Sequence, residues 1–184
     1  PIYACLLALA PVAAQHQHPS MAPVKIPLAM TPVGPPVLEN VSTTPHTVEV
    51  TLTAAPTQVS LLPGVMTPVY AYNGRVPGPL LEVHEGDRVI VHFHNDLPET
   101  TTVHWHGLHI PAVADGSPFN PVAPGHQYDY VFTIQPGTAG TYWYHPHPDA
   151  TTGRQIANGL AGAIVVRAAD DPLGQGDGER APAP

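Results

Sequence analysis

The sequence is almost devoid of cysteine, with Cys5 as the single example among 184 residues. Cys5 lies in the apolar run IYACLLALAPVAAQ, which ends in small residues and is typical of the hydrophobic and cleavage regions of a secretory signal. No methionine and no basic segment precede this run, so residues 1–14 are interpreted as the remnant of a signal peptide. A mature chain beginning near Gln15 contains no cysteine and forms no disulfide. We therefore expect an exported protein, periplasmic or secreted.

Two alternatives apply to the same apolar run. It could form a buried N-terminal strand or a short helix, although its small-residue ending favours a cleaved signal. A lipid anchor on Cys5 is the weaker alternative, because cleavage at that point would leave a long apolar N-terminus on the mature chain.

Positive charge is also scarce. Lys and Arg together number 6 against 14 Asp and Glu, which gives a formal net charge of −8 at pH 7. Nucleic acids and anionic membrane surfaces are bound through clustered basic residues, so neither is an expected partner. We expect no membrane span in the mature chain and a cation or a neutral molecule as its ligand.

A strong helical period is absent, and proline is abundant, at 25 of 184 residues against a typical share of about 5%. Residues 15–45 are proline-rich and have no hydrophobic period, which predicts an extended arm. His16 and His18 have the His-x-His spacing, but a flexible arm gives them no fixed geometry. Residues 46–168 form the predicted domain. The polar, Gly- and Pro-rich residues 169–184 are interpreted as a disordered tail or a truncated interdomain linker.

The central segment alternates apolar and polar residues with the period of a β-strand. Turn residues separate the alternating runs at intervals of about ten residues, and no run has a helical pattern. The predicted strands are HTVEVTLTA from 46, VYAY, LLEVH, RVIVHFH from 88, TVHWH from 102, YDYVFTI from 128, TYWYH from 141 and AGAIVVR from 161. The predicted fold class is therefore all-β, a Greek-key β-sandwich or barrel in a single domain with extended tails.

Histidine is what the sequence has in excess, with 12 copies. Two pairs have the same His-x-His spacing near strand ends: His104 and His106 in TTVHWHGLHI, and His145 and His147 in TYWYHPHP. Residues i and i+2 of a strand point to the same face, with Cα atoms roughly 6.6 Å apart, so each pair can bind one ion or reach two neighbouring ions. Four neutral imidazoles without a thiolate suit copper or zinc, and copper is favoured by affinity. A core or surface role is the alternative for any single histidine.

These residues carry a family resemblance. The segments TTVHWHGLHIPAVADG, PGTAGTYWYHPH and TGRQIANGLAGAIVV together resemble the first cupredoxin domain of multicopper oxidases, the family of laccases and bacterial copper-efflux oxidases. The resemblance runs from about Thr47 to Arg167. It implies a cupredoxin-like (plastocyanin-like) fold.

The resemblance also implies roles for single residues. In the family's H-W-H-G motif the first histidine binds the type 2 copper and the second a type 3 copper, which implies these roles for His104 and His106. In its Y-H-x-H motif both histidines bind type 3 coppers, which implies the same for His145 and His147. An acid after the first motif feeds protons towards the cluster in this family, and Asp115 occupies that position.

The remaining histidines are expected to lie outside the metal site. His92 and His94 share a strand face opposite Val91 and Phe93, so we expect a solvated sheet face there. His84, His109 and His126 are isolated in the sequence by comparison. His109, close to the first motif, is the one that could line the approach to copper.

Two parts of a multicopper oxidase are missing from the sequence: the cysteine of the type 1 copper site, and the H-x-H-x-H and H-C-H motifs of the last domain. The first hypothesis is therefore an N-terminal copper-binding domain of an exported oxidase, inactive alone. Its partners would be C-terminal cupredoxin domains, dioxygen and a small reductant such as cuprous ion or a phenol-like compound. The second hypothesis is a non-enzymatic, single-domain protein that binds and stores copper in the periplasm.

Overall fold

A computed structural model describes residues 34–168 of the chain. The expectations for the signal remnant with Cys5, for the first part of the arm with its two histidines, and for the tail after residue 168 lie outside the described residues. The strands are β1 (Thr47–Leu62), β2 (Val65–Tyr72), β3 (Leu81–His84), β4 (Arg88–Asn95), β5 (His104–His106), β6 (Gln127–Thr133), β7 (Gly140–His145) and β8 (Gly162–Arg167). One short helix, α1 (Thr152–Ala157), precedes β8.

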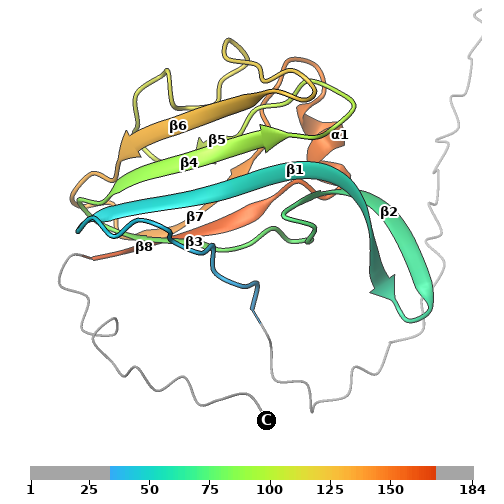
Figure 1. Cartoon of the computed structure of the whole chain (residues 1–184), viewed down its shortest axis with the longest axis horizontal. Helices are drawn as coiled ribbons and strands as arrows, with labels where there is room; N and C mark the ends of the chain where they lie inside the picture. The colour runs from blue at the N-terminus through green and yellow to red at the C-terminus, as the bar shows by residue number, and fades with distance from the viewer. Residues whose placement is uncertain (1–33, 169–184) are drawn as a thin grey trace, which may run out of the picture. The chain divides into compact units, whose positions relative to one another are not determined.

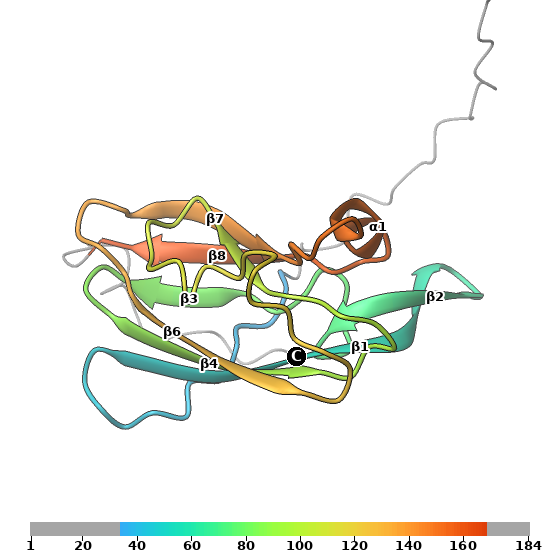
Figure 2. The ribbon, with the colours of Figure 1, turned by 90° about the horizontal axis from the view of Figure 1, so that it is seen from above.

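The strands form two four-stranded sheets, in the orders β2-β1-β4-β6 and β3-β8-β7-β5. The sheets lie as two layers, as Figure 2 shows. Most neighbouring strands are antiparallel, whereas β1 with β4 and β3 with β8 are parallel. The all-β sandwich predicted from the sequence is confirmed.

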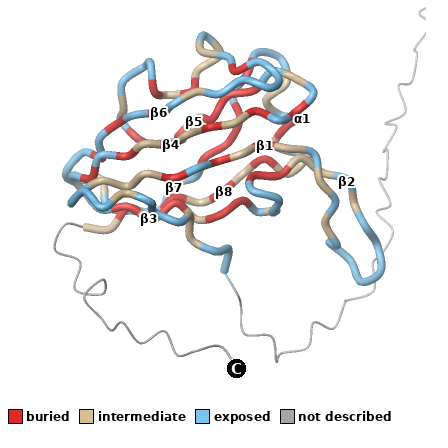
Figure 3. Tube along the Cα trace, in the orientation of Figure 1, coloured by how far each residue is buried: buried red, intermediate tan, exposed pale blue. Residues whose placement is uncertain are grey.

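The core lies between the two sheets and follows from the alternation in each strand. Every second residue of β4 is buried, including Val91 and Phe93, while the residues between them face outwards. Trp105 is buried at the centre and contacts the rings of Tyr130, Phe132 and Tyr144. Figure 3 shows buried residues spread along the strands of both sheets, whereas the hairpin of β1 and β2 is largely exposed.

β1 is longer than the sequence predicts, because it continues beyond Ala54 into a hairpin with β2. Its pairing with β4 ends at Ala54, so the continuation has a partner on one side only, and Pro56 is tolerated on the open side. The hairpin extends away from the two layers in Figure 1. Its tip exposes Leu61, Leu62 and Met66.

The last residues of the expected arm are bonded to the domain. The Leu80 N–H donates to the Pro36 carbonyl and the Leu38 N–H to the Leu80 carbonyl, both at 2.8 Å. Leu38 also packs against the core. Among residues 34–168, no helix has the length and apolar character needed to cross a membrane.

Candidate metal centre

The two predicted histidine pairs lie side by side because β5 pairs with β7. In this antiparallel ladder His104 is directly opposite His145, and His106 is opposite Trp143. Val103 and Trp105 are buried on the other face, as the alternation predicts. His106 and His145, which are 39 positions apart in the chain, thus meet at the β5 edge of the β3-β8-β7-β5 sheet.

His104 is the central ring of the cluster. The centroid of its ring lies 5.5 Å from that of His106, 5.3 Å from that of His145 and 5.3 Å from that of His147. His104, His106 and His145 each offer one ligand atom within 4.8 Å of the others. His147 contacts the cluster but does not belong to this compact group of three.

The loop after β5 fixes the orientation of His104. Nδ1 of His104 lies 2.8 Å from the carbonyl oxygen of Asp115, to which it donates, and 3.3 Å from the Asp115 carboxylate. Nε2 is then left unprotonated and available for a metal ion. The Asp115 side chain is 34% exposed, so its carboxylate is accessible to solvent.

Gly116 allows this loop to lie directly against β5. It has φ of 67°, and a Cβ atom built there would lie 1.8 Å from the Val103 carbonyl oxygen. The loop is also bonded through Trp105, whose Nε1–H donates to the Ala114 carbonyl at 3.0 Å. The carbonyls of Ala114 and Asp115 thus accept hydrogen bonds from the side chains of Trp105 and His104, two consecutive residues of β5.

His145 is the buried member of the cluster. Burial lowers its pKa from the ordinary value to about 4, and the neighbouring imidazoles act in the same direction, against a hydrogen bond to the Pro146 carbonyl. Nδ1 lies 2.9 Å from that carbonyl and Nε2 lies 3.1 Å from Nδ1 of His106. A neutral imidazole at neutral pH is the form that binds metal ions.

The structure adds two residues that were not predicted from the sequence. The indole ring of Trp143 lies 4.0 Å from the ring of His145 and 5.2 Å from that of His106, between centroids. Thr102 accepts a hydrogen bond of 2.8 Å from the His147 N–H. Trp143 precedes His145 by two positions, and Thr102 precedes His104 by two. Because side chains two residues apart in a strand share a face, the strand period could have predicted both residues.

Helix α1 braces the segment that leads into β5. Buried Gln155 accepts a hydrogen bond from the Thr101 hydroxyl at 2.7 Å and donates one to the Thr100 carbonyl at 2.9 Å. Arg154, one residue earlier, pairs with Glu99 and lowers the pKa of that carboxyl to about 2. The segment between Glu99 and β5 is thus attached to α1 as well as to the sheet.

No other histidine among residues 34–168 belongs to the compact group. His92 faces outwards from β4, where Nδ1 is 2.9 Å from Asp129 and Nε2 is 3.0 Å from Glu49. His94 is half-buried on the same strand face, and His109, which the sequence places near the approach to copper, is exposed. His84 and His126 are also exposed.

The donor set of the cluster fits copper. It consists of imidazole nitrogens without a thiolate, and at least His104 has its Nδ1–H committed to a carbonyl. Imidazole ligands of this kind suit copper and zinc, and copper has the higher affinity in the divalent series.

Residues 53–171 match the sequence model of the family "Multicopper oxidase". This chain belongs to that family. It is 38% identical over 116 residues to the multicopper oxidase mco of Staphylococcus aureus, covering 63% of this chain and 26% of that protein. It is 42% identical over 123 residues to a copper resistance protein A homolog of Pseudomonas syringae pv. tomato, covering 65% and 20%.

Solved structures agree with these relatives. A multicopper oxidase from Campylobacter jejuni, described as a metallo-oxidase, superposes with a TM-score of 0.72 at 44% identity, over 76% of this chain and 30% of that one. A multi-copper oxidase from Pediococcus acidilactici superposes with a TM-score of 0.72 at 32% identity, over 88% of this chain and 34% of that one. The cupredoxin-like fold class is thus confirmed. The chain spans about a quarter of the length of the S. aureus relative.

Proposed function

We propose that this chain is the N-terminal domain of an exported multicopper oxidase and supplies half of the ligands of its trinuclear copper cluster. His104 binds the type 2 copper, and His106, His145 and His147 bind the type 3 coppers. The observation that carries the proposal is that the pairing of β5 with β7 brings both His-x-His pairs together, with the other three rings around that of His104. Ligands of a cluster shared by two domains must lie where the second domain can dock. β5 is the edge strand of its sheet, which suits this role.

The described residues divide the work of holding copper. The imidazoles are the ligands, the Asp115 carbonyl keeps Nδ1 of His104 protonated, and Trp143 packs against His106 and His145. The Asp115 carboxylate, exposed on one side and 3.3 Å from His104 on the other, passes protons from solvent towards the cluster. Bound copper supplies the one-electron chemistry that reduces dioxygen.

The remaining machinery belongs to further domains. A type 1 copper needs a cysteine ligand, and the sequence has none outside residues 1–14. We assign residues 46–168 to the copper-binding domain, residues 169–184 to the start of a linker, and residues 1–14 to the signal that directs export. Cuprous ion or a phenol-like compound would reduce the type 1 copper of the complete protein.

A second candidate is a non-enzymatic protein that binds and stores copper through the same four histidines. The exposed positions of His106 and His147 favour it, since an ion bound there stays open to solvent and to exchange.

Sequencing the gene beyond the codon for Pro184 separates the two functions. The oxidase proposal expects H-x-H-x-H and H-C-H motifs downstream, in frame or restored by a frameshift. A stop codon followed by no cupredoxin sequence would favour storage. In either case the copper-loaded chain alone is expected to oxidise no phenol and to lack the intense blue absorption of a type 1 site.

A further inference from the structure

His147 is the member of the histidine cluster that the β-sheet does not hold. The ladder between β5 and β7 ends with the pair His104 and His145, and β7 itself ends at His145. His147 lies two residues further on, between two prolines. A proline has no N–H to donate, so the N–H of His147 is the one backbone donor of residues 146–148.

That N–H is bonded to the segment that leads into β5. It donates to Oγ1 of Thr102 at 2.8 Å. Thr102 precedes His104 by two residues, and the ring centroids of His104 and His147 are 5.3 Å apart. The Thr102 hydroxyl therefore connects the backbone of one proposed ligand to the segment that contains another.

The same two parts of the chain are connected a second time through α1. The helix begins at Thr152, five residues after His147, and contains Gln155. Oε1 of Gln155 accepts a hydrogen bond from the Thr101 hydroxyl at 2.7 Å, and Nε2 donates one to the Thr100 carbonyl at 2.9 Å. Three hydrogen bonds thus join the chain after β7 to three consecutive residues before β5.

The side chains that make this connection are buried. Thr101, Thr102 and Gln155 are each 0% exposed, and together with His145 they are four of the six buried polar or charged residues within residues 34–168. Burying a polar group costs free energy unless it is hydrogen-bonded, and close packing leaves such groups little room to move. Polar side chains concentrated at this place therefore fix the separation of the two segments more narrowly than apolar contacts would.

We propose that Thr102 and Gln155 are positioning residues, which set the place of the His147 ring relative to that of His104 and thereby the geometry of bound copper. Thr102 acts directly on the His147 backbone, and Gln155 acts by holding the segment that contains Thr102. Neither side chain is a ligand. The inference rests on the proposed function, because His147 has to be a copper ligand for its position to matter.

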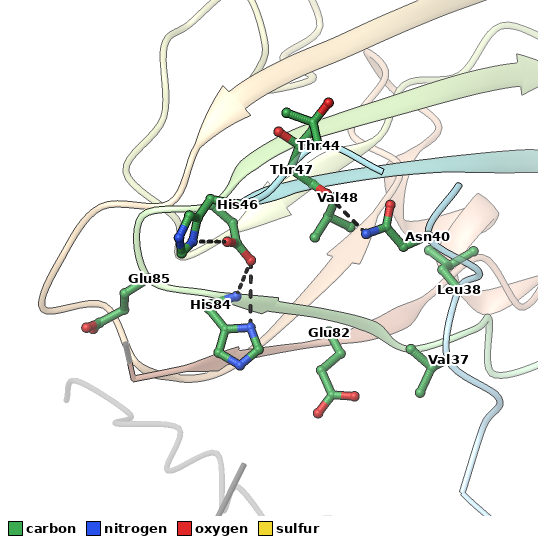
Figure 4. Close-up of a pocket in the computed structure, with 11 residues that line it drawn as sticks. Val37, Leu38, Asn40, Thr44, His46, Thr47, Val48, Glu82, His84 and Glu85 are labelled. Atoms are coloured by element: carbon green, nitrogen blue, oxygen red, sulfur yellow. Dashed lines mark hydrogen bonds and ion pairs between the residues drawn. The ribbon is translucent and has the colours of Figure 1, made fainter. Parts of the chain in front are cut away.

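A contact of the same kind at the other end of the sheet provides a matched control. The buried carboxylate of Asp87 accepts the backbone N–H of His84 at 2.7 Å, and Figure 4 shows this hydrogen bond beside His84. His84 pairs with the last residue of β8, and the residue before that one pairs with the first residue of β7. The six residues of β7 span roughly 17 Å at about 3.4 Å per residue, so the Asp87 contact is remote from the cluster.

Copper affinity of the full chain tests the proposal. Thr102→Val keeps the shape of the side chain but removes the acceptor, so Cu²⁺ affinity should fall about tenfold. Thr102→Ser keeps the hydroxyl and should stay within about twofold of the wild type. Gln155→Met should lower the affinity in the same direction as Thr102→Val, whereas Asp87→Ala should leave it unchanged. Competition with a chelator, followed by electron paramagnetic resonance of Cu²⁺, measures the affinities.

A double-mutant cycle with His147→Ala separates positioning from stability. Removing the proposed ligand should itself lower Cu²⁺ affinity about tenfold or more. Thr102→Val should then have no further effect, because the ring that it positions is absent. A threonine that only stabilised the fold would lower the affinity equally in both backgrounds.

The possible failures are distinguishable. Unchanged affinity in Thr102→Val, with reduced affinity in His147→Ala, would overturn the positioning role and leave the ligand assignment standing. An equal loss from Thr102→Val in both backgrounds would also overturn it. Unchanged affinity in His147→Ala would refute the ligand assignment and the positioning role together. If Thr102→Val does not fold, Gln155→Met in the same cycle gives the decision.

Discussion

Strands β4 and β5 contain the same His-x-His spacing, and their histidines have different surroundings. Opposite His92 in the neighbouring strand is Asp129, whereas opposite His104 is His145. Both ring nitrogens of His92 meet carboxylates, at 2.9 and 3.0 Å. One ring nitrogen of His104 meets a carbonyl, and the other is left for a metal ion.

The difference shows that the cross-strand partner decides what a histidine pair can do. A carboxylate occupies the ring nitrogens with hydrogen bonds and favours the charged imidazolium, which cannot bind a metal ion. In β5 and β7, by contrast, His104 and His145 face each other and each donates Nδ1–H to a backbone carbonyl. The other nitrogen of each ring is then unprotonated, and these nitrogens lie close together. Predictions about the two pairs therefore test this explanation directly.

The largest expected effect concerns copper binding. Replacing His104 and His106 with alanine removes two of the proposed ligands, and copper affinity at neutral pH should fall by about 100-fold or more. Replacing His92 and His94 in the same way should leave affinity unchanged. Titration of both double variants with Cu²⁺, followed by electron paramagnetic resonance, measures the difference. Loss of binding in the β4 variant with retention in the β5 variant would show that the ligands are assigned to the wrong pair.

The local sequence predicts the face of each histidine but not its neighbour. Alternation correctly buries Phe93 between one pair and Trp105 between the other. The partners come from far along the chain: Asp129 is 37 residues from His92, and His145 is 39 residues from His106. Such contacts depend on the strand order of the sheet, which periodicity does not contain.

The family motifs supplied part of that missing information. They mark the pair in β5 and the pair at the end of β7 as parts of one site, whereas no motif marks Glu49 and Asp129 as partners of His92. The continuation of β1 into a hairpin was missed for a related reason. A proline such as Pro56 usually ends a strand because it has no N–H to donate. It is tolerated within β1 because, beyond Ala54, β1 has a neighbouring strand on one side only.

The second prediction tests the loop that orients His104. In Gly116→Ala the new methyl group would lie 1.8 Å from the Val103 carbonyl oxygen, at a residue with φ of 67°. Overpacking of 1–3 kcal/mol and left-handed strain of 1–2 kcal/mol together predict a destabilisation of about 3 kcal/mol. Urea unfolding measures it, and copper affinity should fall as well because the loop moves away from β5.

Gly125→Ala is the matched control. Gly125 has φ of 73° with no atom within 4 Å of a built Cβ, so only the strain applies, about 1 kcal/mol. Copper affinity should not change in this variant. Equal destabilisation of the two variants would mean that the loop does not lie against β5 as described.

The smallest expected effect concerns the carboxylate-bound pair. Hydrogen bonds from the His92 ring to the carboxylates of Glu49 and Asp129 raise the pKa of His92 above its ordinary value of 6.5. A raised pKa in the folded state means that the stabilisation is fully present below the unfolded pKa and is lost as the pH rises through the folded pKa. The contribution should remain below about 1 kcal/mol, because the side chains of His92 and Glu49 are both 35% exposed and solvent screens them.

His92→Gln tests this contribution by urea unfolding at pH 5.5 and pH 8.5. The free energy of unfolding of the variant should lie below that of the wild type at pH 5.5, and the gap should narrow towards pH 8.5 as the pH rises through the raised pKa of His92. His94→Gln is the control on the same strand face, since no carboxylate of residues 34–168 forms a hydrogen bond or ion pair with its ring. If the His92 gap were the same at both pH values, the positive charge of the imidazolium would add nothing to stability. A neutral imidazole has one N–H and can donate to only one of the two carboxylates, so the charge of the imidazolium would then have no part in keeping copper away from β4.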